Sequence, residues 1–263
     1  MELTSENYFS HEAEVKYISA SQVKSFKRCE AAAVAELSGA YRREMSQALM
    51  VGQYVDAALT GDLDDWCGCH PEIKKRDGTL RAEFLQASEM VGRANRDKLF
   101  MEFMEGDHQT ILKAPILGGY WFKAKLDVLG GGRIVDLKTV RDLSPVYLPG
   151  QGRVDFATAW DWPLQMAIYQ KIYEQVSGEK LPCYLAVITK ETPADLAVIQ
   201  VEQERMDAEI AWLETALPRI EALKEGLIEP ERCGRCAYCR ESHQLTGPVM
   251  LGEYEEIGGS GNE

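Results

Sequence analysis

The chain has 263 residues, of which 45% are hydrophobic and 27% are charged, and its formal net charge is -13 at pH 7. This size predicts one large domain with a sizeable core, and the acidic balance excludes a protein whose whole surface attracts nucleic acid, because such binding depends on Lys and Arg neutralising phosphates. The N-terminus is polar and acidic and no run of 18 apolar residues is present, which argues against a signal peptide or a membrane span and predicts a cytoplasmic protein.

The predicted elements alternate between helical and extended periodicity. Residues 1–17 carry no periodicity and are expected to form an irregular lead-in. Apolar residues at helical spacing then predict single helices at 19–37, 45–61, 80–104, 161–176 and 203–225. A loop that ends in an Asp-Gly turn is expected at 62–78, and a Pro- and Gly-rich irregular stretch at 143–153. Period-two alternation predicts strands at 110–117, 119–129, 133–140, 183–190 and 196–202. The predicted fold class is therefore α/β, with a central mixed sheet flanked by helices.

Two acids flank the Gly-Gly-Gly stretch of a predicted hairpin. A two-residue type I′ turn centred on residues 131–132 suits glycine, because both positions need positive φ. Residues whose numbers sum to 263 then pair, so that Asp127 faces Asp136 and Lys125 faces Lys138 on one side of the hairpin. Facing carboxylates destabilise a sheet unless a cation compensates them, and a divalent metal ion would do so. The alternative is a solvated face on which the two lysines pair with the two acids.

An acid and, nine positions later, an Asp-x-Lys resemble the core of PD-(D/E)xK nucleases, with Asp127, Asp136 and Lys138 in the motif positions. Downstream, Gln165 and Tyr169 have the Q-x-x-x-Y spacing found in RecB-type nucleases, and at i and i+4 of a helix they point the same way.

Upstream of the hairpin, Asp56 stands where RecB-type nucleases usually place a His after a Gly. An oxygen ligand at this position is acceptable for Mg²⁺ or Mn²⁺, whereas the alternative is a partly exposed helix acid.

The resemblance implies roles for these residues. Asp127 and Asp136, with Asp56 and the carbonyl of Leu137, would hold one or two Mg²⁺ or Mn²⁺ ions. Lys138 would orient the attacking water and stabilise developing charge, and Gln165 and Tyr169 would contact the phosphate or the scissile nucleotide. The local basic patch that DNA binding requires would comprise Lys123, Lys125, Arg133, Arg141, Arg153 and Lys190.

Three cysteines near the end of the chain have the spacing C-x-x-C-x-x-C: Cys233, Cys236 and Cys239. A closed tetrahedral zinc or a cubane cluster needs a fourth ligand. The S-x-S-x-x-x-x-F-x-x-C stretch at 19–29 resembles the opening of iron-sulfur RecB-type nucleases, which implies that Cys29 completes a structural [4Fe-4S] cluster. The local alternative, His243, would indicate Zn²⁺.

Taken together, the order and spacing of these motifs over residues 18–243 resemble phage PDDEXK-like exonucleases related to exonuclease VIII, with a restriction-endonuclease-like fold. The resemblance implies a divalent-metal-dependent DNA exonuclease acting on linear single- or double-stranded ends in phage recombination or repair, in the cytoplasm of a bacterial host. A single-strand annealing protein is a candidate partner and a homo-oligomer a candidate state, with no membrane association. The alternatives are a non-catalytic DNA-binding or regulatory protein with the same fold and cluster, and a zinc-ribbon interaction module fused to an unrelated α/β domain.

The domain organisation follows from these boundaries. We expect a lead-in at 1–17, a nuclease domain at 18–228, a cysteine cluster segment at 229–245 that closes on Cys29, and a flexible tail at 246–263.

Overall fold

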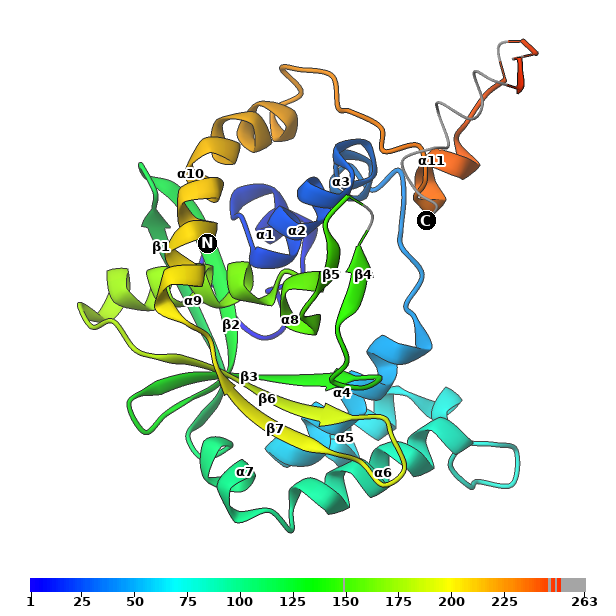
Figure 1. Cartoon of the computed structure of the whole chain (residues 1–263), viewed down its shortest axis with the longest axis vertical. Helices are drawn as coiled ribbons and strands as arrows, with labels where there is room; N and C mark the ends of the chain where they lie inside the picture. Colours follow the sequence, from blue (N-terminus) through cyan, green and yellow to red (C-terminus); the bar gives the residue numbers. More distant parts are fainter. Residues whose placement is uncertain (149, 246, 249, 252–263) are drawn as a thin grey trace.

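A computed structural model describes residues 1–148, 150–245, 247–248 and 250–251 (Figure 1). Most of the tail expected at 246–263 therefore lies outside the described residues. The helices are α1 (His11–Lys16), α2 (Ala20–Arg28), α3 (Glu30–Leu37), α4 (Gln47–Thr60), α5 (Leu63–Cys69), the short 3-10 helix η1 (Pro71–Ile73), α6 (Ala82–Ala94), α7 (Lys98–Phe103), α8 (Phe156–Ala159), α9 (Trp162–Ser177), α10 (Gln203–Lys224) and α11 (Ala237–Glu241). The strands are β1 (Asp107–Ile116), β2 (Tyr120–Gly130), β3 (Arg133–Val140), β4 (Val146–Leu148), β5 (Gly152–Val154), β6 (Cys183–Thr189) and β7 (Leu196–Gln200).

Within the described residues, five strands form one mixed sheet in the order β1-β2-β3-β6-β7. The β3–β6 pair is parallel and the other neighbours are antiparallel. Helices α2, α9 and α10 cover one face and α4, α6 and α7 the other (Figure 1). The α/β class with a central mixed sheet flanked by helices is therefore confirmed. None of the helices in this part of the chain is long and apolar enough to span a membrane.

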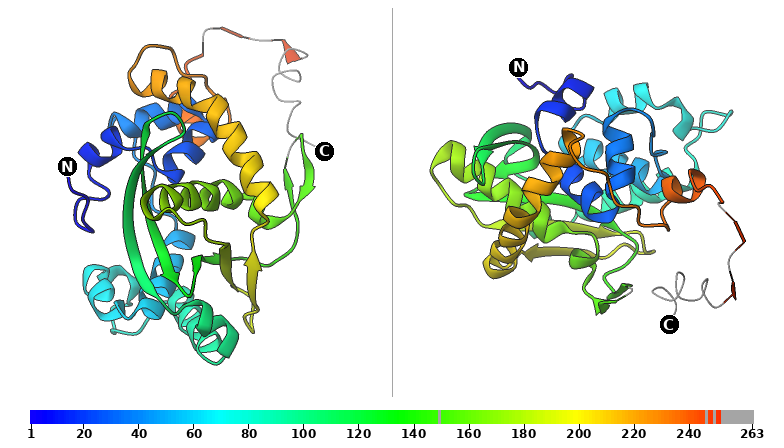
Figure 2. Two further views of the ribbon diagram at one scale, coloured as in Figure 1. Left: turned by 90° about the vertical axis from the view of Figure 1, so that its left-hand side faces the viewer. Right: turned by 90° about the horizontal axis from the view of Figure 1, so that it is seen from above.

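Apolar side chains that alternate along the strands pack into a separate core on each face of the sheet. In β3, Ile134 packs into the core with α9, whereas Val135 and Leu137 pack into the core with α4 and α6. The β1–β2 ribbon is long and curved, and α9 packs against it (Figure 2). The polar residues of β3 thus lie between two closed apolar layers.

The predicted hairpin turn is confirmed, and the predicted register is confirmed for the three residue pairs next to the turn. Gly131 and Gly132 have φ of 57° and 69°, and Val128 pairs with Val135, so the sum rule holds. The ladder does not continue to the acids in this described segment. A side-chain oxygen of Asp127 instead accepts a hydrogen bond from the backbone N–H of Leu137, at 2.8 Å. The two strands therefore part at the acidic residues.

The N-terminal segment covers the edge of β2 beyond this point. Ile18 forms a parallel bridge with Phe122, donating its N–H to the carbonyl of Trp121 and accepting from the N–H of Lys123, both at 2.9 Å. Residues 11–16 form α1, which Ser10 caps by accepting from the N–H of Ala13. The expectation of an irregular lead-in is therefore wrong for these residues.

Two predicted single helices are each broken in two. The first stops at Cys29, whose backbone is extended with φ of -167° and ψ of 108°. The second stops after Ala94, and Asp97 starts α7 by accepting from the N–H of Phe100. Shorter elements also occupy stretches expected to be irregular: α5 and η1 fall within 62–78, and the β4–β5 hairpin overlaps 143–153.

Candidate active site and cysteine cluster

The acids of the hairpin lie where β2 and β3 part. Asp136 is buried, with 2% of its surface exposed, and one of its oxygens, Oδ1, accepts a hydrogen bond from Nε2 of Gln165 at 2.8 Å. The other oxygen, Oδ2, forms an ion pair with the ammonium group of Lys138. Asp127 is held through its Oδ2 by the N–H of Leu137. The structure therefore brings the three motif residues together, as the spacing predicts.

Gln165 and Tyr169 extend from α9 into the same site. The amide NH₂ of Gln165 also donates to the hydroxyl of Tyr169 at 3.1 Å, and its Oε1 accepts from the amine of Lys24 at 2.6 Å. Lys24 lies on α2, 141 positions earlier in the chain, and no sequence motif indicates it. Burial and the neighbouring Lys138 lower the pKa of Lys24 to about 7. The orientation of the Gln165 amide is fixed from both ends, because its oxygen accepts from Lys24 and its NH₂ group donates to Asp136 and Tyr169.

Asp56 reaches the site from α4, on the other side of the sheet. Gly52, one turn earlier, lets this helix approach β3, since a Cβ atom at Gly52 would lie 3.3 Å from the hydroxyl oxygen of Thr139. Oδ2 of Asp56 accepts a hydrogen bond from Nε2 of Gln109 at 3.0 Å. Sequence patterns do not indicate Gln109 either.

The site concentrates negative charge in a buried position. Burial raises the pKa of Asp127 well above its usual range, and the Asp136 carboxylate raises it further. Burial also raises the pKa of Asp56 to about 6, although the nearby Lys125 opposes this. Burial lowers the pKa of Lys138, but Asp136 and Asp127 outweigh it and the net pKa lies above the usual value. The site thus contains more carboxylate charge than one lysine compensates.

The donor atoms fit a divalent metal ion. Oδ1 of Asp56 and Oδ2 of Asp136 are both buried. Among the described residues Oδ1 of Asp56 accepts no hydrogen bond, and the partner of Oδ2 of Asp136 is the ammonium group of Lys138. Carboxylate oxygens are the hard ligands that Mg²⁺ and Mn²⁺ prefer. Leu137 contributes its N–H to Asp127 and its side chain to the core, and its carbonyl stays a predicted ligand.

A groove of about 990 Å³ leads to these residues. Its wall contains an exposed aromatic side chain, Phe9, and polar side chains from α2, α4, β2 and α9. The site residues and amines in this wall are Asp56, Asp127, Gln165, Tyr169, Gln109, Lys24 and Lys125. Asp136 borders the groove through its contact with Gln165.

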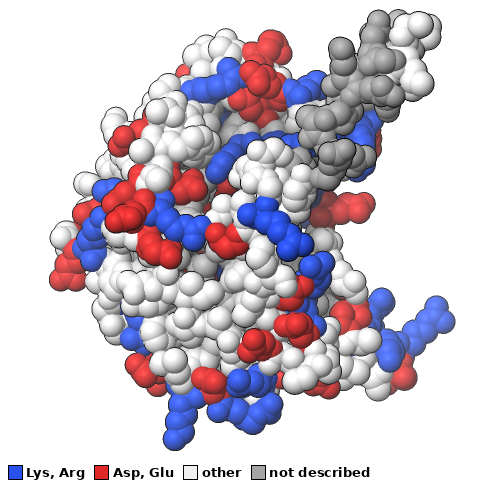
Figure 3. All heavy atoms as spheres, viewed as in Figure 1, with Lys and Arg blue, Asp and Glu red and all other residues white. Residues whose placement is uncertain are grey.

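The basic patch expected from the sequence is wrong in part. Lys123 is fully buried, and its amine donates to the carbonyl of Tyr8 at 2.5 Å and to Glu14 at 2.7 Å. Arg133 packs over the ring of Phe103, 4.3 Å from its centre, beside the hairpin turn. On the face in Figure 3, acidic and basic side chains are interspersed. Basic contacts near the acids therefore come from Lys24 and Lys125 in the groove wall.

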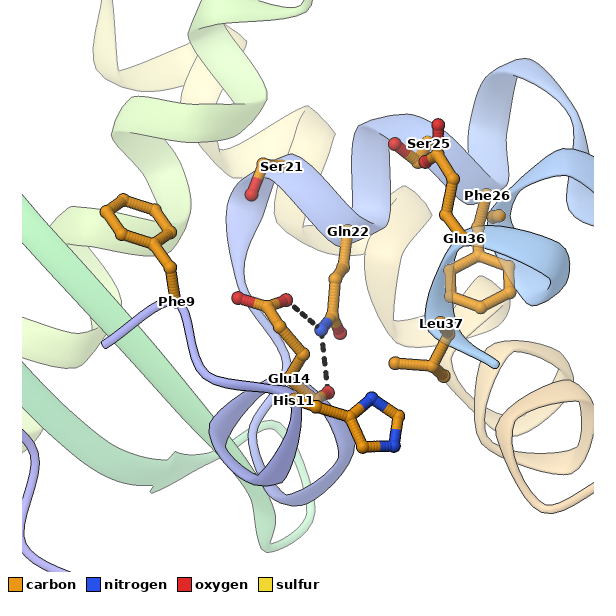
Figure 4. Close-up of a pocket in the computed structure, with 10 residues that line it drawn as sticks. Phe9, His11, Glu14, Ser21, Gln22, Ser25, Phe26, Glu36 and Leu37 are labelled. Atoms are coloured by element: carbon orange, nitrogen blue, oxygen red, sulfur yellow. Dashed lines mark hydrogen bonds between the residues drawn. The ribbon is translucent and has the colours of Figure 1, made fainter. Parts of the chain in front are cut away.

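A smaller pocket of about 400 Å³ adjoins the groove along α2 (Figure 4). Phe9 and Ser21 line both spaces. In the smaller pocket the amide of Gln22 donates to the backbone carbonyl of Glu14 at 2.7 Å and also to its carboxylate. These bonds tie α1 to α2, and Glu14 also accepts from Lys123 of β2, so α1 connects the helix that carries Lys24 to the sheet.

The four cysteines predicted to bind a cofactor converge on one point. The sulfur atoms of Cys29, Cys233, Cys236 and Cys239 all lie within 4.8 Å of one another. Those of Cys29 and Cys239 are 3.5 Å apart and those of Cys233 and Cys239 are 3.9 Å apart. In the described part of the chain this group contains Cys29 and not His243, so Cys29 is the candidate fourth ligand. Cys29 occupies the break between α2 and α3, which explains why the predicted single helix is interrupted.

Backbone groups prepare this cluster for a cation. Burial raises the pKa of Cys233, but the N–H groups of Arg235 and Cys236 outweigh it, and the net pKa falls to about 6. A thiolate is the form that binds metals. Burial raises the pKa of Cys29, and it raises the pKa of Cys236 to about 12. The close spacing of the four sulfur atoms is therefore what fits a metal ion or an iron-sulfur cluster.

A second link holds the cysteine segment to the helices. The carboxylate of Glu30, next to Cys29, accepts two hydrogen bonds from Arg219 on α10, at 2.6 and 2.7 Å. It also accepts from the N–H of Glu231 at 2.8 Å. The cofactor ligands are therefore not the sole connection between α3 and the C-terminal segment.

Comparison with known proteins identifies a matching family and a similar crystal structure. A family model described as a PDDEXK-like domain of unknown function (DUF3799) matches residues 19–242. A crystal structure of a "putative exonuclease" from Eubacterium rectale superposes with a TM-score of 0.92 at 37% sequence identity, covering 97% of this chain and 98% of that chain. None of the curated proteins compared matches the chain.

Proposed function

The chain belongs to the family of PDDEXK-like domains DUF3799, and from this we propose that it is a divalent-metal-dependent DNA exonuclease, with a role in phage recombination or repair. The observation that carries the proposal is the meeting of Asp127, Asp136 and Lys138 at the point where two strands part, beside a large groove. A nuclease fold implies a nucleic acid substrate, and the structural neighbour is itself described as an exonuclease. Linear DNA ends, single- or double-stranded, are the proposed substrate.

The acids would hold the metal and the lysine would act on the phosphate. Asp127, Asp136 and Asp56 would bind one or two Mg²⁺ or Mn²⁺ ions, with the carbonyl of Leu137 as a further ligand. A divalent ion bound there lowers the pKa of the attacking water and neutralises charge on the phosphate. Lys138, held beside Asp136, orients the water and stabilises charge that develops in the transition state.

Gln165 and Tyr169 have positioning and contact roles in this proposal. Gln165 fixes one oxygen of Asp136, which leaves the other toward Lys138 and the metal. The hydroxyl of Tyr169 lines the groove and can donate to a phosphate oxygen. Lys125 offers a charge to the DNA backbone from the same wall.

For the four cysteines we propose a structural cofactor. Their sulfur atoms all lie within 4.8 Å of one another, a convergence that fits the [4Fe-4S] cluster that the resemblance implies and also its alternative, Zn²⁺. Metal analysis of protein purified without air distinguishes them, because the cluster is brown and contains about four irons per chain.

The nuclease proposal is tested with DNA labelled at either end. Purified protein should shorten linear single- or double-stranded DNA in Mg²⁺ or Mn²⁺, leave closed circular DNA intact, and stop when EDTA is added. The label that is released first gives the polarity. Cleavage of the circle would identify an endonuclease, and DNA binding without cleavage would support the non-catalytic alternative. Sedimentation of the same sample tests the proposed homo-oligomer, and capture of a phage annealing protein tests the proposed partner.

A further inference from the structure

Gln109 has a backbone conformation that is unusual within a strand. It lies in β1 but has φ of 54°, the left-handed region, where side chains with a Cβ are strained. Its neighbours His108 and Thr110 pair with Val128 and Leu126 of β2. The same register would set Gln109 opposite Asp127, and the left-handed turn takes it out of the ladder there. A strained residue is kept only where surrounding contacts hold it, and such residues gather at functional sites.

The contact that Gln109 makes lies in the candidate active site. Its amide nitrogen donates to Oδ2 of Asp56 at 3.0 Å, and both side chains line the groove. Oδ1 of Asp56 is buried and accepts no hydrogen bond from any described residue. The amide therefore occupies one oxygen and leaves the other directed away from protein donors.

The same arrangement occurs at the second carboxylate. Gln165 donates to Oδ1 of Asp136, and Oδ2 of that residue faces the ammonium group of Lys138. Asp56 comes from α4 on one side of the sheet, and Gln165 comes from α9 on the other. A glutamine thus fixes the rotation of each carboxylate. It leaves the second oxygen to Lys138 at Asp136, and without a partner among the described residues at Asp56. Residues that orient ligands in this way change metal affinity when they are removed.

We propose that Gln109 is a positioning residue that holds Asp56 as a ligand of the divalent metal ion, and that its left-handed backbone is retained because it brings the amide to Asp56. The inference rests on the proposed function for the presence of that ion. It also assigns Asp56 to the metal site, because a partly exposed helix acid would need no strained glutamine. Gln109 acts through Asp56 and does not touch the substrate.

Two variants of Gln109 separate the effect of losing its side-chain amide from the effect of relieving its backbone strain. Gln109→Ala removes the amide and keeps the strain, whereas Gln109→Gly removes the amide and relieves the strain. Both should weaken Mn²⁺ binding by about 10- to 100-fold, measured by electron paramagnetic resonance titration of the free ion. Without metal, the Gly variant should melt about 2 to 4 °C above the Ala variant, because relief of the strain stabilises its folded state.

The outcomes distinguish this inference from the proposed function. Wild-type protein that binds no Mn²⁺ would overturn the proposed function and this inference with it. Wild-type binding with both variants within twofold of it would overturn the inference alone. Equal melting temperatures of the Gly and Ala variants would overturn the claim of backbone strain. The expected result is lost affinity in both variants and a higher melting temperature in one, a combination that a merely structural glutamine does not give.

Discussion

Replacing Cys29 with serine should remove the group held by the four cysteines and destabilise the whole chain. Cys29 and Cys239 lie 210 positions apart, and their sulfur atoms are 3.5 Å apart. In the chain-entropy view, a cross-link that closes a loop of this length is worth about 5 kcal/mol at 25 °C. That is a large part of the roughly 5 to 15 kcal/mol by which a domain is stable. The ion pair between Glu30 and Arg219 is unaffected, so about 5 kcal/mol is an upper bound.

Urea unfolding followed by circular dichroism measures this loss. With a slope of about 3 kcal/mol per M, the midpoint should fall by up to about 1.7 M, and bound zinc or iron should fall with it. Cys69→Ser is the matched control, because Cys69 is exposed and lies outside the group of four. His243→Ala should behave like this control. A Cys29→Ser protein that keeps its metal and its midpoint, or loss of the metal in His243→Ala, would refute the assignment of Cys29 as the fourth ligand.

At the acidic site, Asp136→Asn should abolish both DNA cleavage and the rise in melting temperature that Mg²⁺ or Mn²⁺ causes, because the metal stabilises the state that binds it; an unchanged thermal shift would contradict the carboxylate site. Lys138→Ala should lower kcat by about 10²-fold or more with DNA affinity nearly unchanged, as expected of an interaction made in the transition state. Lys125→Ala should mainly weaken DNA binding and reduce its salt slope by about one, and equal mild effects of the two changes on kcat would indicate a plain phosphate-binding face. Because the folded pKa of Asp56 is raised to about 6, its proton is held more tightly in the folded than in the unfolded chain. Metal-free stability should therefore fall as pH rises from about 4 to 6, and metal affinity should rise over the same range; calorimetric melting and Mn²⁺ titration at several pH values check both directions.

The fold was predictable where a local rule decides the structure. The two glycines at 131–132 dictate the turn type, and the turn type dictates the register that Val128 and Val135 adopt. The fold was not predictable where a contact with residues far away in the sequence decides the local structure. Cys29 interrupts a helical pattern because three distant cysteines lie beside it, and Lys123 is buried because Glu14 covers it. Alternation alone predicted an exposed lysine there.

The residues of the candidate site likewise fall into those that a sequence motif identifies and those that it does not. Asp127, Asp136 and Lys138 have a fixed spacing on adjoining strands, so a pattern of a dozen residues identifies them, and i,i+4 spacing does the same for Gln165 and its neighbour on α9. Lys24 and Gln109 enter the site through tertiary packing of α2 and through a left-handed residue in β1. Neither a helix lysine nor a strand glutamine has a sequence signature for such a role.

The position of Cys29 sets an order of events during synthesis of the chain. Ribosomes add about 5 to 20 residues per second, so Cys29 is made roughly 10 to 40 s before Cys239, which lies 210 positions later. During that interval Cys29 is a free thiol at the end of α2, and the helix that carries Lys24 lacks its connection to the C-terminal segment. All strands of the nuclease sheet have been synthesised once β7 is made, before any of Cys233, Cys236 and Cys239 is added to the chain. Insertion of the proposed cofactor would consequently be a late step of folding. A chain interrupted between β7 and Cys233 contains every predicted catalytic residue but only one of the four thiols.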